Sequence, residues 1–294
     1  MSIEKIGFIG VGNLGMPMAR SLLKSGFRLT VYDIRPEAVE KMRALGAIGA
    51  KSCRDVALAC EIIISMVYTA AQTDDVFFGK DGVWQGLKKG SIIILTSTLA
   101  PSYCRELYSK AKKKGAQVID CAVTDPSGQR HRMGSLTLMI GGDKGAVGQC
   151  RPIFEALGKH IYHMGGIGMG QTCKLVHQIN AFNVATITRE SLNLGLKAGL
   201  DFKKMVEALS NGRGSTKGLQ HMAARLRSLK PAPASGAITK RASGPGVGMN
   251  KDSELALEMA EEIGVNMPIA RFMAELDTTS EYEAYSKEMR KYAI

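Results

Sequence analysis

The chain lacks the features that mark membrane, disulfide-stabilised or zinc-binding proteins. No apolar run in its 294 residues approaches the ~20 residues that a membrane-spanning helix needs. Its six cysteines form no CxxC pair and have no histidine at metal-ligand spacing, so we expect neither a metal site nor a disulfide framework. The first residues lead into a strand-like run without a signal-peptide pattern. These absences predict a reduced, cytoplasmic protein.

Aromatic residues are also scarce, at 6% of the chain, whereas lysine and arginine outnumber aspartate and glutamate by 39 to 27. A basic chain that binds nucleic acid usually gathers its charge in a patch with interleaved aromatic side chains. Here the short basic groups, such as residues 110–114, lie within amphipathic segments without that interleaving. The charge therefore favours an anionic cofactor and a small polar or anionic substrate over nucleic acid or a membrane surface.

Short apolar runs alternate with amphipathic stretches from residue 5 to about residue 163. This alternation predicts a doubly wound α/β domain with a mainly parallel sheet, of the Rossmann type. A long helical period begins at about residue 171, and further helical patterns follow at 202–211, 216–229, 249–264 and 268–291. We therefore predict a dinucleotide-binding domain over 1–165 and an all-α domain over 166–294, joined by the long helix.

A glycine-rich turn stands between the first predicted strand and the first predicted helix. Gly10, Gly12 and Gly15 form GxGxxG, which allows a tight turn, close approach of a pyrophosphate, and packing of helix on strand. The intervening Asn13 and Leu14 are assigned to the same cofactor-binding loop. The start of the helix would offer amide donors and a positive dipole end to the phosphates. The motif predicts that the chain binds a dinucleotide.

The choice between NAD and NADP depends on the end of the second predicted strand. Asp33 lies 18 residues beyond Gly15, where a carboxylate accepts hydrogen bonds from the adenine ribose and repels a 2′-phosphate. Arg35 could instead pair with that phosphate, stack on adenine or remain solvated. We expect NAD as the cofactor, with NADP as the alternative.

A second group of polar residues begins the long helical segment. Lys174, His177 and Gln178 are spaced i, i+3 and i+4 and therefore share one helix face. Because this helix begins where the dinucleotide domain ends, we expect its lysine to face a cleft between the domains. A lysine there can exchange a proton with a hydroxyl or carbonyl oxygen while hydride moves at carbon. His177 and Gln178 would position that oxygen.

Several motifs in order resemble the β-hydroxyacid dehydrogenase family. They are FIGVGNLGMPMARSLLKSG, SMVYTAAQTDDVFFG, TSTLAPSYCREL, GQTCKLVHQ and MNKDSELALEMA. The resemblance implies Lys174 as the catalytic lysine, with His177 and Gln178 as its polar neighbours. It further implies that the cofactor is contacted by Met66 and Val67, by Thr98 and by Lys251. Relatives pair through the long helix, so the resemblance also implies a homodimer or homotetramer.

The chain departs from the family pattern where the substrate carboxylate is normally held. The usual Ser-Gly-Gly is replaced by Thr124, Asp125 and Pro126, and Pro126 has no N–H to donate. Either Arg130 or a basic neighbour binds an anion from the side, or the substrate carries a neutral or cationic group toward Asp125. The basic residues could also merely solvate the loop.

The function predicted from these residues is NAD(P)-dependent interconversion of a short hydroxylated substrate and its aldehyde or ketone. An imine reductase or amino-alcohol dehydrogenase of the same fold is the alternative that Asp125 suggests. A cofactor-binding scaffold without turnover is a third, although such a protein has no need of Lys174. Ala181 stands where the 6-phosphogluconate branch of the family places a second acid, which disfavours oxidative decarboxylation.

Overall fold

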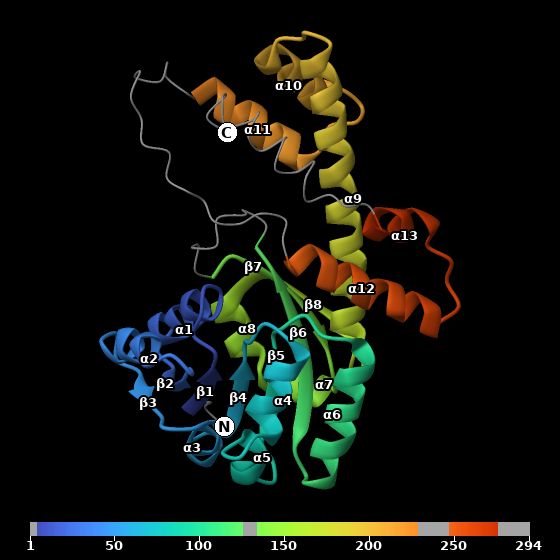
Figure 1. The fold of residues 1–294 in the computed structure, drawn as a ribbon. Coiled ribbons are helices and arrows are strands. Elements are labelled where there is room, and N and C mark those ends of the chain that lie inside the picture. The colour runs from blue at the N-terminus through green and yellow to red at the C-terminus, as the bar shows by residue number, and fades with distance from the viewer. Residues whose placement is uncertain (1–4, 126–133, 229–246, 276–294) are drawn as a thin grey trace. The chain divides into compact units, whose positions relative to one another are not determined.

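The computed structural model describes residues 5–125, 134–228 and 247–275 (Figure 1). The chain divides into two compact units, Met1–Val176 and His177–Ile294. The first is an α/β unit, and the described part of the second is entirely helical. Helix α9 (Met169–Lys197) begins in the first unit and continues into the second. The predicted fold class, a Rossmann-type domain joined by a long helix to an all-α domain, is confirmed.

The first unit is built on an eight-stranded sheet with the order β3-β2-β1-β4-β5-β6-β7-β8. Neighbouring strands are parallel except for β6 and β7, which pair antiparallel. The strands are β1 (Lys5–Ile9), β2 (Arg28–Tyr32), β3 (Ile48–Gly49), β4 (Ile62–Ser65), β5 (Ile92–Leu95), β6 (Gln117–Thr124), β7 (Leu136–Gly141) and β8 (Gly158–Gly165). The order reverses between β1 and β4, and ligands of doubly wound folds bind at the carboxyl ends of strands beside such a point.

Helices cover both faces of this sheet and create two apolar cores. One core contains side chains from α1, α2, α7 and α8, and the other contains side chains from α3, α4, α5 and α6. Strands β4 and β5 are buried along their whole length, which explains their uninterrupted apolar sequences. The helices are α1 (Gly15–Lys24), α2 (Pro36–Arg43), α3 (Cys53–Ala59), α4 (Ala70–Phe78), α5 (Val83–Gly86), α6 (Pro101–Lys113), α7 (Lys144–Gln149) and α8 (Arg151–Leu157).

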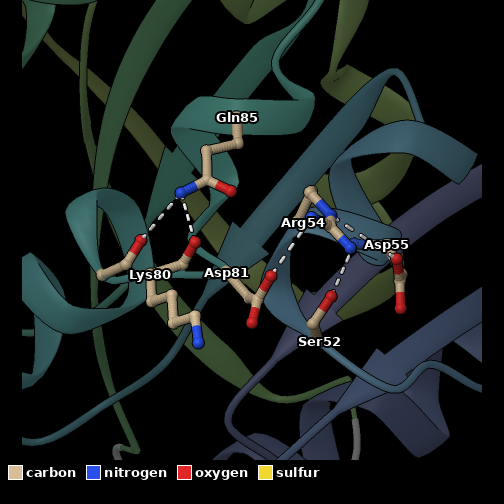
Figure 2. A network of polar contacts seen from close by, with 7 residues as sticks. Ser52, Arg54, Asp55, Lys80, Asp81 and Gln85 are labelled. Atoms are coloured by element: carbon tan, nitrogen blue, oxygen red, sulfur yellow. Dashed lines mark hydrogen bonds and ion pairs between the residues drawn. The ribbon is translucent and has the colours of Figure 1, made fainter.

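A polar network ties the start of α3 to the loop between α4 and α5 (Figure 2). Ser52 caps α3 by accepting a hydrogen bond from the backbone N–H of Asp55 at 3.0 Å. The guanidinium of Arg54 lies 3.2 Å from the carboxylate of Asp81, whose carbonyl also accepts the Arg54 backbone N–H at 2.8 Å. Gln85 donates from its side-chain amide to carbonyl oxygens of the same loop. These contacts fix the loop beside the second apolar core.

The second unit contains α10 (Phe202–Asn211), α11 (Lys217–Ser228), α12 (Val247–Glu262) and α13 (Pro268–Glu275) besides the later turns of α9. Apolar side chains of α9, α10 and α11 form its core, centred on Phe202 and Val206. The predicted helix over 268–291 is described only as far as Glu275. The predicted loop over 230–248 lies almost entirely outside the described residues. Among the described residues, no helix combines the length and apolar character needed to cross a bilayer.

Candidate active site

The turn between β1 and α1 contains two glycines that the packing of the protein itself requires. Gly10 has a φ of +90°, and a Cβ atom there would lie 2.2 Å from the carbonyl oxygen of Met66. A Cβ atom at Gly15 would lie 1.9 Å from the carbonyl oxygen of Gly10. Both distances are far below contact distance, so larger residues at these positions would push α1 and the β4 end away from β1.

Gly12 has no such internal reason to be a glycine. The nearest atom to a Cβ there would be the Arg35 guanidinium nitrogen Nη2, at an ordinary contact distance of 3.4 Å. The N-cap residue of α1, Leu14, makes no side-chain capping bond, and the first turn of α1 contains no acidic residue. Asn13 is exposed in the same loop. A position without a side chain or a nearby backbone atom, beside a helix N-terminus and the Arg35 guanidinium, fits the pyrophosphate of a dinucleotide.

Asp33, directly after β2, is paired with Arg35. The guanidinium of Arg35 donates from Nε and Nη2 to the two carboxylate oxygens at 3.0 and 3.2 Å, and its backbone N–H donates to Oδ1 at 3.0 Å. The Asp33 side chain is 6% exposed, whereas that of Arg35 is 55% exposed. The hydrogen bond to Asp33 raises the pKa of Arg35 above its ordinary value. The sequence analysis assigned Asp33 and Arg35 to separate contacts with the cofactor and did not predict that they pair with each other.

The segments after β4 and β5 lie next to the glycine turn. Met66 donates its backbone N–H to the carbonyl of Ile9 at 2.9 Å. The backbone N–H of Val67 donates to the Ser97 hydroxyl at 3.1 Å, which joins the two segments. Thr98, the next residue, is half-buried. The structure therefore brings Met66 and Val67 to the glycine turn, with Thr98 on the adjoining segment, and their contact with a cofactor stays a prediction.

The start of α9 is fixed by a buried carboxylate that sequence reasoning had not assigned to the site. Asp120, in β6, is 0% exposed. Its Oδ1 accepts the backbone N–H of Gly168 at 2.6 Å, and its Oδ2 accepts that of Gln171 at 2.8 Å. Burial raises the pKa of Asp120, and these backbone hydrogen bonds oppose the rise. A carboxylate at this end of the helix satisfies free N–H groups and complements the helix dipole.

Gln171 is a second buried contact of the same helical turn. Its side-chain Oε1 accepts the backbone N–H of Leu99 at 3.1 Å, and its Nε2 donates to the carbonyl of Ser97 at 2.7 Å. The residue is 0% exposed. An aspartate inside the apolar run VIDCAV and a glutamine at a helix start were the only sequence signals, and neither indicates partners dozens of residues away.

Lys174 lies one helical turn beyond Gln171 and is 8% exposed. Lysine is almost never so buried unless its ammonium is paired or used. Lys174 and Leu175 are buried, whereas His177 is exposed and Gln178 is half-buried. The predicted catalytic lysine thus occupies a protected position on a helix whose start is fixed to the sheet.

His177 and Gln178 belong to the second unit, where Gln178 connects α9 to α12. The Nδ1 of His177 lies 3.1 Å from the side-chain oxygen of Gln178. Gln178 donates its side-chain amide to the buried carboxylate of Asp252 at 2.7 Å. Burial lowers the pKa of the neighbouring Lys251, an effect that Asp252 opposes. The structure thus places Lys251 beside the residue that holds Gln178.

The residues predicted to contact substrate lie at the end of β6. Thr124 pairs with Thr137 of β7, and both Thr124 and Asp125 are half-buried. Arg130 lies outside the described residues, so its predicted role stays a prediction. Within the described part of the chain, no group of three or more His, Cys, Asp or Glu side chains is arranged to hold a metal ion.

Two family models together match nearly the whole chain. The NAD binding domain of 6-phosphogluconate dehydrogenase matches residues 5–166. The model described as NAD-binding of NADP-dependent 3-hydroxyisobutyrate dehydrogenase matches residues 168–289.

Individual relatives agree with these matches. The 2-hydroxy-3-oxopropionate reductase of Escherichia coli is 34% identical over 94% of this chain and 90% of its own length. The NAD-dependent L-serine dehydrogenase of Pseudomonas aeruginosa is 33% identical over 74% of this chain and 73% of its own length. A solved 3-hydroxyisobutyrate dehydrogenase from Salmonella typhimurium shares the fold, with a TM-score of 0.78 at 24% identity over 96% of this chain and 95% of its own. With a turn that fits a dinucleotide and a matching family model over each half, this chain belongs to the β-hydroxyacid dehydrogenase family.

Proposed function

We propose that this enzyme interconverts a short acid carrying a β-hydroxyl group and the corresponding carbonyl compound, with Lys174 as the general acid and base. The observation that carries the proposal is the burial of Lys174, at 8% exposure, one turn beyond a helix start that two buried side chains fix to the sheet. Membership of a family of NAD(P)-dependent dehydrogenases supports the reaction class.

The cofactor site consists of Gly10, Gly12, Gly15 and the segments after β2, β4 and β5. Residues 1–165 would form the cofactor domain, and 166–294 would complete the substrate site. When bound, the dinucleotide supplies the hydride acceptor or donor. The absence of a side chain at Gly12 would let the pyrophosphate approach the backbone, and the Asp33–Arg35 pair would meet the adenine ribose. Because the Arg35 charge is already compensated by Asp33, we propose NAD as the preferred cofactor.

Lys174 moves the proton that accompanies hydride transfer. In the oxidative direction its unprotonated amine accepts the proton of the substrate hydroxyl, and in the reductive direction its ammonium returns a proton to the carbonyl oxygen. His177 and Gln178 orient that oxygen by hydrogen bonding. The contact between Gln178 and Asp252 limits the rotamers available to the amide, which supports this role. Lys251 contributes a positive charge to the cofactor phosphates.

The substrates of the relatives and the residues at the end of β6 together support a substrate class. The relatives include enzymes of L-serine, 3-hydroxyisobutyrate and 2-hydroxy-3-oxopropionate, which are all short acids with an oxygen at the β-carbon. Thr124 would donate its hydroxyl to the substrate. Asp125 adds a negative charge that favours a substrate with an ammonium group, while Arg130 would bind the carboxylate from the side.

We also propose that the protein is cytoplasmic and assembles as a homodimer or homotetramer. Large apolar side chains of α9 support this assembly, because Ile187 is 58% exposed and Leu194 is 73% exposed. Light scattering at micromolar concentration tests the proposal, and a monomer would contradict it.

A cofactor-coupled screen tests the proposed reaction. Purified protein is mixed with NAD or NADP and with L-serine, 3-hydroxyisobutyrate, hydroxysulfonates or amino alcohols, and the absorbance of the reduced nicotinamide is followed. We expect turnover with at least one β-hydroxyacid. Tight NADH binding without turnover of any class would instead identify a cofactor-binding scaffold.

A further inference from the structure

Gln171 lies at the centre of a chain of hydrogen bonds that joins the start of α9 to the ends of β4, β5 and β6. The amide contacts both ends of the Ser97–Leu99 segment after β5, and the Ser97 hydroxyl in turn accepts the backbone N–H of Val67 after β4. The backbone N–H of Gln171 is held by Asp120 of β6. The side chain of Gln171 therefore links the helix that carries Lys174 directly to the segment after β5 and, through Ser97, to the segment after β4.

The partners of Gln171 require a side chain that both donates and accepts. The carbonyl of Ser97 needs a donor, and the N–H of Leu99 needs an acceptor, so the orientation of the amide is fixed by its surroundings. Both contacts are buried, where an unmatched polar group is costly. Asp120 alone already satisfies N–H groups at the start of α9. The side chain of Gln171 therefore fixes the position of the helix relative to the 97–99 segment.

We propose that Gln171 is a positioning residue for proton and hydride transfer. It holds Lys174, one turn further along α9, at a fixed distance from the segments containing Val67 and Thr98. This inference rests on the proposed function of Lys174. An error of about 1 Å in such a placement costs on the order of 100-fold in rate.

The variant Gln171→Glu tests the proposal without changing the size of the side chain. A carboxylate still accepts from Leu99 but cannot donate to Ser97, so we expect kcat at about pH 9 to fall by roughly 10- to 100-fold. Burial raises the pKa of such a glutamate, and at about pH 6 its protonated form regains a donor. The ratio of wild-type to variant kcat should therefore shrink at least about threefold between about pH 9 and pH 6. The Kd of NADH should change less than kcat, because Gly12 and Asp33 are untouched.

Gln117→Glu is the matched control, because it makes the same change at the opposite end of β6 from Thr124. We expect it to retain the wild-type kcat and pH profile even where its thermal stability falls. A Gln171→Glu enzyme with wild-type kcat, or with a kcat ratio that does not vary with pH, would overturn the positioning role. The separate variant Lys174→Ala distinguishes failure of the positioning role from failure of the proposed function. If Lys174→Ala retains full turnover, the proposed function itself fails, whatever the result for Gln171→Glu.

Discussion

Arg35 donates two guanidinium hydrogen bonds and one backbone hydrogen bond to the carboxylate of Asp33. In the sequence, Asp33 by itself favours NAD and Arg35 by itself favours NADP. In the structure the two side chains form one ion pair. A cofactor 2′-phosphate would have to draw Arg35 away from Asp33 and would then face the carboxylate. An unphosphorylated ribose can accept hydrogen bonds from Arg35 and donate to Asp33 without breaking the pair.

Substitution of Asp33 by Asn should change the cofactor preference. The amide keeps the size of the side chain but removes the negative charge, which frees Arg35 to pair with a phosphate. We expect the ratio of kcat/KM for NADPH to that for NADH to rise by about tenfold or more, equivalent to ~1.4 kcal/mol. Steady-state kinetics with both cofactors measure this ratio. Arg35→Ala should lower the same ratio. A rise of the ratio in both variants would contradict the proposed role of the Asp33–Arg35 pair in cofactor preference.

Alanine at Gly12 and alanine at Gly15 should have different effects. At Gly12 the added methyl group meets no backbone atom, so we expect normal folding with NADH affinity weakened by about tenfold or more. At Gly15 the methyl group would lie 1.9 Å from the Gly10 carbonyl oxygen, so unfolding stability should fall by about 1–3 kcal/mol. NADH fluorescence titration and urea unfolding separate the two effects. Equal loss of stability in both variants would show that Gly12 is structural.

Removal of the Lys174 amine should abolish most of the activity but leave cofactor binding intact. Lys174→Ala should lower kcat by on the order of 10²–10⁴, the usual contribution of a positioned acid or base. The Kd of NADH should stay within about threefold of the wild-type value, because the glycine turn and Asp33 supply most of the affinity. Stopped-flow or steady-state assays and fluorescence titration measure the two quantities.

The variant Lys174→Arg separates the positive charge of this residue from its ability to accept a proton. It keeps the positive charge, but a guanidinium stays protonated and cannot accept the substrate proton at neutral pH. We expect it to be nearly as inactive as the alanine variant in the oxidative direction. High activity in Lys174→Arg would reduce the role of this position to electrostatics and would make His177 the next candidate base.

Cys150 should make stability depend on alkaline pH. Burial raises the pKa of its thiol from 9.0 to about 12, so the folded protein keeps this proton while the unfolded chain releases it. The contribution to stability is complete below about pH 9 and is lost as the pH rises toward 12, with ~1.4 kcal/mol lost by about pH 10. Urea unfolding of wild type and Cys150→Ala between about pH 7 and 10 measures it. The variant should lose less stability over this range, and parallel curves would exclude the effect.

The sequence patterns were sufficient for the core of the fold but not for its edges. Continuous apolar runs predicted β4 and β5 because both strands are buried on both faces. Strand β3 has only two residues, and Ile48 is 56% exposed, so no hydrophobic pattern marks it. Strand β8 lies at the other edge of the sheet with most of its side chains exposed, and KHIYHM therefore lacks the alternation that indicates a strand.

The candidate site shows the same division between local and non-local information. The glycine turn and the Lys174 face are local spacings, which a single sequence displays. The contacts of Asp120 with Gly168 and Gln171 join residues about fifty positions apart, and those of Gln171 with Ser97 and Leu99 span more than seventy. A buried carboxylate in VIDCAV signals that a partner exists, but only the topology identifies it.

The antiparallel pairing of β6 with β7 has an evolutionary consequence. Because Thr124 of β6 pairs with Thr137 of the antiparallel strand β7, the connection between the two strands does not require the crossover helix of a parallel pair. Its length and sequence can drift while both anchoring strands keep their register. The departure from the family pattern that the sequence indicates, at Asp125 and Pro126, falls in this connection. New substrate preferences can therefore arise here without altering the scaffold that binds the dinucleotide.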